Sequence, residues 1–91
     1  MIICNCILHL ELPYVQSLKG RRSVTNSMKE KLKAFNLSVL DVSGEYAKEA
    51  ELAVVYAAAN EKLCAQVFQT IESLLQKRYP ELQYDADLEM L

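Results

Sequence analysis

Alternating apolar and polar residues near both ends of the chain predict two strands. In residues 4–12 the even positions are apolar, whereas Asn5, His9 and Glu11 occupy odd positions. Residues 82–90 repeat the pattern, with apolar side chains at even positions and acidic or amide side chains at odd ones. Because successive strand side chains point to opposite faces of a sheet, each segment is expected to bury one face.

Two longer segments repeat apolar residues at intervals of three or four and therefore predict amphipathic helices. The first covers residues 18–34, with Ser17 as its N-cap and Asn36 as a left-handed cap after its end. The second follows the cap residue Asn60 and ends at Arg78, shortly before Pro80.

Two further strands are predicted between these helices. Residues 37–42 are rich in apolar and β-branched side chains, and Ser43 and Gly44 mark a turn after them. A charged loop follows. Residues 52–58 are apolar at both odd and even positions, which favours a strand inside the sheet that is covered on both faces.

The predicted order is strand, helix, strand, strand, helix, strand, which is typical of a ferredoxin-like βαββαβ fold of the α+β class. That fold is a two-layer sandwich in which two helices cover one face of a four-stranded antiparallel sheet. The chain has 91 residues, of which 52% are hydrophobic. A chain of this length has room for one core, so residues 1–91 are expected to form a single domain.

The sequence favours a cytoplasmic protein without a membrane segment. No stretch approaches the roughly 20 apolar residues that cross a bilayer. The apolar run at the N-terminus has neither the basic start nor the cleavage site of a signal peptide. The three cysteines are an odd number, and without an export signal they favour reduced thiols over a disulfide framework.

Two short motifs resemble the YlxP-like family, a bacterial domain family of unknown function. They are Ser17-Leu18-Lys19-Gly20-Arg21-Arg22 and Phe35-Asn36-Leu37-Ser38-Val39. The resemblance covers nearly the whole chain. It implies a ferredoxin-like fold and an association, through gene neighbourhood, with translation initiation and ribosome maturation, but no established activity.

Three positions depart from the family pattern, and the first of them, Arg21, replaces the usual lysine and keeps its charge. Gly20 stands where relatives usually carry an acid that would complete a capping box with Ser17, so this helix start is expected to be weaker. Tyr46 stands where relatives commonly carry a tryptophan.

Positive charge concentrates in the first part of the chain. Residues 1–36 have a formal charge of +4 and residues 37–91 one of −6, although the net charge is only −2. Spacings of three and four place one set of polar residues on one side of the first helix, over about 21 Å. This set, called the basic face below, is Lys19, Arg22, Asn26, Lys29 and Lys33, with Arg21 beside it.

A rigid row of cations can follow nucleic-acid phosphates without reading sequence. Together with the resemblance, the basic face predicts a non-catalytic accessory protein that contacts RNA, either rRNA or ribosomal particles. No DNA partner is expected. The alternative is an ordinary solvated helix face.

The sheet face turned away from the helices, called the open face below, gives a second hypothesis. Its last strand is acidic and is expected to repel phosphate. The apolar residues Ile3 and Ile7, with Val54 and Tyr56, are candidates for self-association, which would make the protein a homodimeric interaction module. Parity in the third strand leaves open whether Ala53 and Ala57 take the place of Val54 and Tyr56.

No catalytic or metal-binding constellation is predicted. His9 and the three cysteines have the ligand types of a zinc site, but strand parity places His9 on the face opposite Cys4 and Cys6. All three cysteines are interpreted as small core residues. The carboxylates of Asp85, Asp87 and Glu89 share one strand face and are interpreted as a solubilising edge, although oxygen ligands suit Mg²⁺ or Ca²⁺. We therefore expect no enzyme, no metal and no cofactor.

Overall fold

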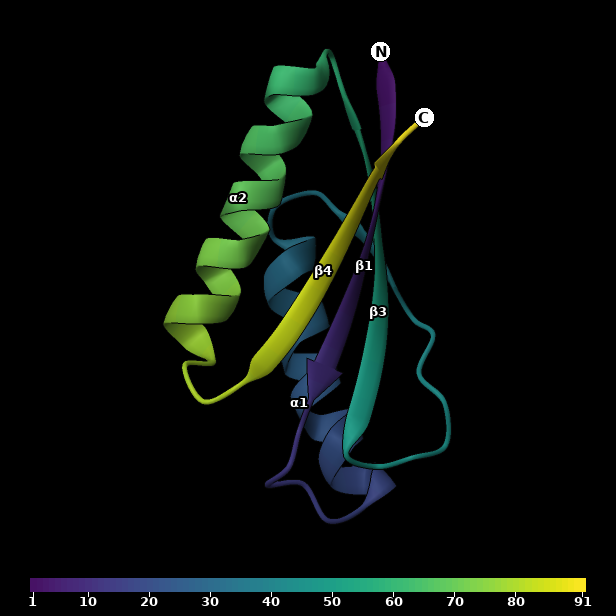
Figure 1. Ribbon diagram of the computed structural model, residues 1–91, viewed down its shortest axis with the longest axis vertical. Coiled ribbons are helices and arrows are strands. Elements are labelled where there is room, and N and C mark those ends of the chain that lie inside the picture. Colours follow the sequence, from purple (N-terminus) through teal and green to yellow (C-terminus); the bar gives the residue numbers. More distant parts are fainter.

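Strands and helices follow one another in the predicted βαββαβ order in the computed structural model, which describes residues 1–91 (Figure 1). The elements are β1 (Ile2–Glu11), α1 (Leu18–Lys33), β2 (Ser38–Asp41), β3 (Glu49–Ala58), α2 (Glu61–Arg78) and β4 (Gln83–Met90).

The four strands form one antiparallel sheet in the order β2-β3-β1-β4. Both helices cover the same face of this sheet (Figure 1). This arrangement confirms the predicted ferredoxin-like class. It also makes β2 and β4 the edge strands, so the acidic side chains of β4 lie at an edge of the sheet.

The core lies between the sheet and the two helices. The even positions of β1 from Cys4 to Leu10 point into it and are at most 1% exposed. Met28 and Leu32 of α1 and Ile71 and Leu75 of α2 pack there from the helices. The apolar positions of β1 and the apolar stripes of the helices therefore pack against each other in one core.

The predicted caps of the helices are confirmed. The Ser17 hydroxyl oxygen accepts a hydrogen bond from the Gly20 N–H at 3.0 Å, and the Asn60 side-chain oxygen accepts one from the Leu63 N–H at 2.9 Å. Asn36 has a φ of 65°, in the left-handed region that asparagine tolerates better than most residues. These contacts satisfy backbone groups that a helix end leaves without partners.

Strand β3 differs from its prediction in two respects. It begins at Glu49 and not at residue 52, because Glu49, Ala50 and Glu51 pair with the end of β1. It is also covered on one face only, and Val55 is 40% exposed on the other. These three residues belong to the predicted charged loop. They extend β3 because β1 lies beside them, and the sequence pattern alone does not reveal that pairing.

The structure corrects the assignment of Val54 and Tyr56 to the open face. Both side chains point toward the helices and are buried. The Tyr56 hydroxyl donates a hydrogen bond to the backbone carbonyl of Cys64 at 2.9 Å, which ties β3 to α2. Because β3 is apolar at both parities, its sequence pattern did not distinguish the two faces.

The cysteines occupy the core as predicted, but not all of them are free thiols. A disulfide joins Cys4 of β1 to Cys64 of α2, which corrects the expectation of three reduced side chains. Cys4 is at one of the even positions of β1, whose side chains face the helices. Cys64 is one of the buried residues of α2 and lies against it. Cys6 is free, and burial, together with the nearby Glu72 and Asp87, raises the pKa of its thiol to about 11.

Neither α1 nor α2 has the combined length and apolar character that a membrane-spanning helix requires.

Candidate functional site

The basic face of α1 is displayed to solvent. Lys19, Arg22, Asn26 and Lys33 are exposed, and Lys29 is half-buried. Both ion pairs of the molecule involve His9, and none of these cations lies within 4.0 Å of a carboxylate. The cations of the basic face are therefore available to an anionic partner.

Arg21 has a different role from the rest of the predicted set. Its guanidinium Nη1 donates to the backbone carbonyls of Tyr46 at 2.9 Å and Glu49 at 3.1 Å. Arg21 thus fastens the loop of residues 42–48 to α1. Lys31, a further cation of α1, donates to the Ser27 hydroxyl, and its Nζ lies 5.5 Å from the centre of the Tyr79 ring.

The open face has an apolar area on its β1, β2 and β3 strands. Ile3 and Ile7 lie there as predicted, and the pairing register places Ala53, Val55 and Ala57 of β3 beside them. Leu40 of β2 pairs with Ala53 and is 64% exposed. Leu40 was not among the predicted residues, because the parity of β2 was not assigned from the sequence.

Carboxylates border this apolar area on two sides. The pairing register places six acidic residues on the open face, one of them on β1 itself. No lysine or arginine lies on any strand. The six are Glu11, Glu49, Glu51, Asp85, Asp87 and Glu89. The open face is therefore strongly negative, while α1 on the opposite layer is basic.

His9 is the only base among these acids. Its Nδ1 lies 3.0 Å from Glu51 Oε1 and its Nε2 lies 3.3 Å from Asp87 Oδ2, so the ring bridges β3 and β4 across β1. The predicted separation of His9 from Cys4 and Cys6 is confirmed, since the cysteines lie in the core.

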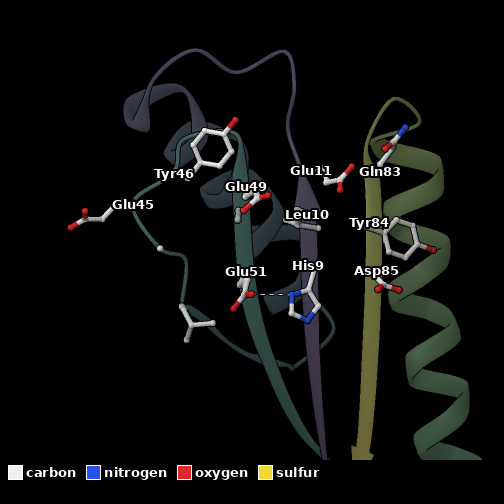
Figure 2. Close-up of a pocket in the computed structure, with 13 residues that line it drawn as sticks. His9, Leu10, Glu11, Glu45, Tyr46, Glu49, Glu51, Gln83, Tyr84 and Asp85 are labelled. Atoms are coloured by element: carbon white, nitrogen blue, oxygen red, sulfur yellow. Dashed lines mark hydrogen bonds and ion pairs between the residues drawn. The ribbon is translucent and has the colours of Figure 1, made fainter.

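A pocket of about 780 Å³ lies at the end of the sheet where β1 and β3 meet the loop of residues 42–48. Figure 2 shows Glu51, Glu49 and Glu11 around it, with Tyr46 on the loop side and Asp85 on the β4 side. Tyr84 also borders the pocket, but its hydroxyl is directed to α2, where it contacts Gln76 and Glu72. The pocket is thus acidic with one exposed aromatic ring.

Hydrogen bonds hold the loop that forms the wall of this pocket. The Ser43 hydroxyl oxygen accepts from the Glu51 N–H at 2.9 Å, and the Ser43 N–H donates to Asp41 Oδ1 at 2.9 Å. Desolvation acts to raise the pKa of Asp41, but hydrogen bonds from Ser43 and the charge of Arg21 outweigh it and hold that pKa below its usual value. The wall of the pocket is therefore held by hydrogen bonds within the chain.

A family model for proteins of unknown function, DUF503, matches residues 3–87. The chain belongs to the DUF503 family. This agrees with the sequence expectation of a family without an assigned activity. No curated protein shows significant similarity to the chain.

Solved structures similar to this DUF503 chain share its fold at low sequence identity. A de novo designed protein with a ferredoxin fold, LFR1, aligns with a TM-score of 0.62 and 12% identity over 98% of this chain and 86% of its own. A protein from Thermus thermophilus described as a putative PII-like signalling protein aligns with a TM-score of 0.56 and 14% identity over 98% and 86%.

A dimeric ferredoxin-like protein from an uncultured marine organism aligns with a TM-score of 0.55 and 10% identity over 100% of this chain and 94% of its own. At these identities the similarities establish the fold alone. The ferredoxin fold carries many unrelated functions, so it does not by itself identify one.

Proposed function

We propose that this protein is a non-catalytic accessory protein that binds RNA, including the RNA of ribosomal particles, through the basic face of α1. One observation carries the proposal: Lys19, Arg22, Lys29 and Lys33 follow one side of a rigid helix without a carboxylate partner. With Asn26 included, successive members of the face are three or four residues apart, which is about 4.5 to 6 Å along the helix. Such a row suits a phosphate backbone.

The distribution of charge supports α1 as the contact surface. The open face carries six carboxylates and repels phosphate, so it is unsuited to the base stacking that RNA-recognition sheets use. The net charge of −2 provides no general attraction to RNA. Binding would depend on the basic face and would weaken steeply as salt concentration rises.

The remaining chemistry favours binding over catalysis. The only histidine lies between two carboxylates, and all three cysteines are buried in the core. The resemblance to the YlxP-like family supports a bacterial, translation-associated role, and this role implies the cytoplasm.

Charge reversal on the basic face tests the RNA proposal. The double variant Arg22→Glu with Lys29→Glu should weaken co-sedimentation with ribosomal particles, and binding to an rRNA fragment in gel-shift titrations, by at least about tenfold. Each substitution replaces an attraction for phosphate by a repulsion. Thermal unfolding of both proteins would verify that the variant folds.

The matched control is Lys62→Glu with Lys77→Glu, which makes the same charge change at exposed positions of α2. This control should retain most of the affinity. Equal losses in both variants, or wild-type binding that does not respond to salt, would contradict a specific role of α1.

A second candidate function is homodimerisation through the open face. The exposed Leu40, Val55 and Ile3 favour it, and a marine protein of similar fold is described as dimeric. The carboxylates weigh against it, because stacking two open faces brings two acidic surfaces together. A monomer in light scattering at tens of micromolar protein would exclude this candidate.

A further inference from the structure

The open face has no partner inside the molecule, although it exposes apolar side chains. Leu40 is 64% exposed, Val55 40% and Ile3 39%, and the register places all three on the face away from the helices. Both helices lie on the other side of the sheet (Figure 1). An antiparallel sheet can leave one face to water, but that face is then usually polar throughout.

The carboxylates on this face lack the balancing cations that a solvated surface would carry. Glu11 and Glu49 lie directly opposite each other on β1 and β3, a cross-strand pair of like charges that opposes folding. No lysine or arginine lies on any strand, and Lys48, the nearest in sequence, donates to the carbonyls of Pro13 and Val15. The His9 imidazole between Glu51 and Asp87 is the only base on this face, and no lysine or arginine of the strands balances its negative potential.

The pocket provides a place where one cationic side chain can be held. Its volume of about 780 Å³ exceeds that of a single side chain, and carboxylates border it from β1, β3 and β4. Tyr46 is 61% exposed at its loop side (Figure 2). A guanidinium can bind a carboxylate through two parallel hydrogen bonds and stack on an aromatic ring, whereas an ammonium cannot do both equally well.

We propose that the open face is a docking surface for a Lys- and Arg-rich segment of another protein. One arginine of that segment enters the pocket between Tyr46 and the carboxylates of Glu49 and Glu51. Apolar side chains of the segment cover Leu40 and Val55.

Charge complementarity favours a basic segment as the occupant of the open face over RNA or a second copy of this chain. RNA is repelled by the six carboxylates, and a second copy docked face to face would double them. A basic segment instead neutralises the opposed pair Glu11 and Glu49. The inference is independent of RNA binding, which concerns the opposite layer of the molecule.

The test uses three fluorescein-labelled peptides of about ten residues, which span about 33 Å when extended. The first contains Arg, Lys and Leu, the second replaces each Arg and Lys by Glu, and the third replaces each Leu by Ser. Fluorescence anisotropy with the full chain should show binding of the first, weaker binding of the third and none of the second. Amide chemical shifts should move on β1, β3, β4 and the loop of residues 42–48.

Neutralising substitutions locate the electrostatic part of the contact. The triple variant Glu49→Gln, Glu51→Gln and Asp85→Asn should weaken binding of the first peptide by at least about tenfold. A matched variant with Glu30, Glu61 and Glu81 changed to Gln alters net charge equally at exposed sites outside the open face. It should bind nearly as the wild type does. Both variants should retain RNA binding. A loss of peptide binding with RNA binding intact therefore tests the open face separately from the basic face of α1.

Leu40→Ser tests the apolar part of the contact. This variant should weaken binding of the leucine-containing first peptide several-fold and leave binding of the third peptide, which has serine in place of leucine, unchanged. The proposal is overturned if the basic peptide does not bind, if both triple variants lose affinity equally, or if the shifted amides lie on α1 or α2. It is also overturned if the protein without peptide self-associates and Leu40→Ser abolishes that association.

Discussion

The side chain of Asp41 fixes the chain reversal that follows β2 and leads into the pocket wall. Its Oδ1 accepts the Ser43 N–H, and Ser43 in turn binds the backbone of Glu51 through its hydroxyl. Arg21 lies near enough to contribute to the lowered pKa of this carboxyl. The ionised form of Asp41 is therefore preferred in the folded protein.

Asp41→Asn should lower the free energy of unfolding at neutral pH by less than about 1 kcal/mol, because the group is largely solvated. The pKa of Asp41 is depressed in the folded state, so its contribution is complete above the unfolded pKa of about 4. It disappears as the pH falls through the lower folded pKa. Urea unfolding of both proteins at a series of pH values would show the difference shrinking in acid.

Glu45→Gln is the control, since Glu45 is an exposed carboxylate on the same loop. A stability difference between wild type and Asp41→Asn that stays constant down to strongly acidic pH would show that the ionised carboxylate is not responsible.

Helix α1 begins with an incomplete set of capping contacts. Ser17 accepts the N–H of Gly20, but the first turn of α1 carries no acidic residue. Glycine also costs about 1 kcal/mol relative to alanine inside a helix. A β-carbon added at Gly20 would meet the Ser17 Oγ and Val15 Cγ1 at 3.4 Å, an ordinary contact distance.

Gly20→Ala should therefore raise the free energy of unfolding by about 0.5 to 1 kcal/mol, or the melting temperature by about 4 °C. Gly20→Glu should raise it further, because its carboxylate can accept the N–H of Ser17 and complete the capping box. Circular dichroism melts measure both effects. A lower melting temperature for Gly20→Ala would mean that the Val15 contact is too tight.

At the scale of elements, the sequence predicted those features that a single strand or helix specifies alone. The alternation in β1 and β4 and the caps Ser17 and Asn60 needed no information about neighbours. Strand β3 could not be assigned without information about its neighbour, because both of its faces are apolar. Only the pairing of Ala53 with Ile7 and of Val54 with Cys6 shows which face is buried. The start of β3 likewise depends on the partner residues at the end of β1.

At the scale of the whole molecule, the sequence showed a basic first part and an acidic remainder. Folding converts this division along the chain into two opposite layers, with α1 on one side and the acidic open face on the other. The pocket could not be predicted in this way. Its carboxylates come from three strands that are distant in sequence, and the contact between His9 and Glu51 spans 42 residues.

Arg21 has a position that matters for any attempt at separation-of-function mutagenesis. Its side chain leaves α1 beside the basic face and ends on the carbonyls of Tyr46 and Glu49 at the pocket wall. A substitution at Arg21 would disturb both layers of the molecule, and its phenotype could be assigned to neither. Lys19, Arg22, Lys29 and Lys33 on one layer, and Leu40 and Asp85 on the other, are the positions at which genetics can distinguish the two surfaces.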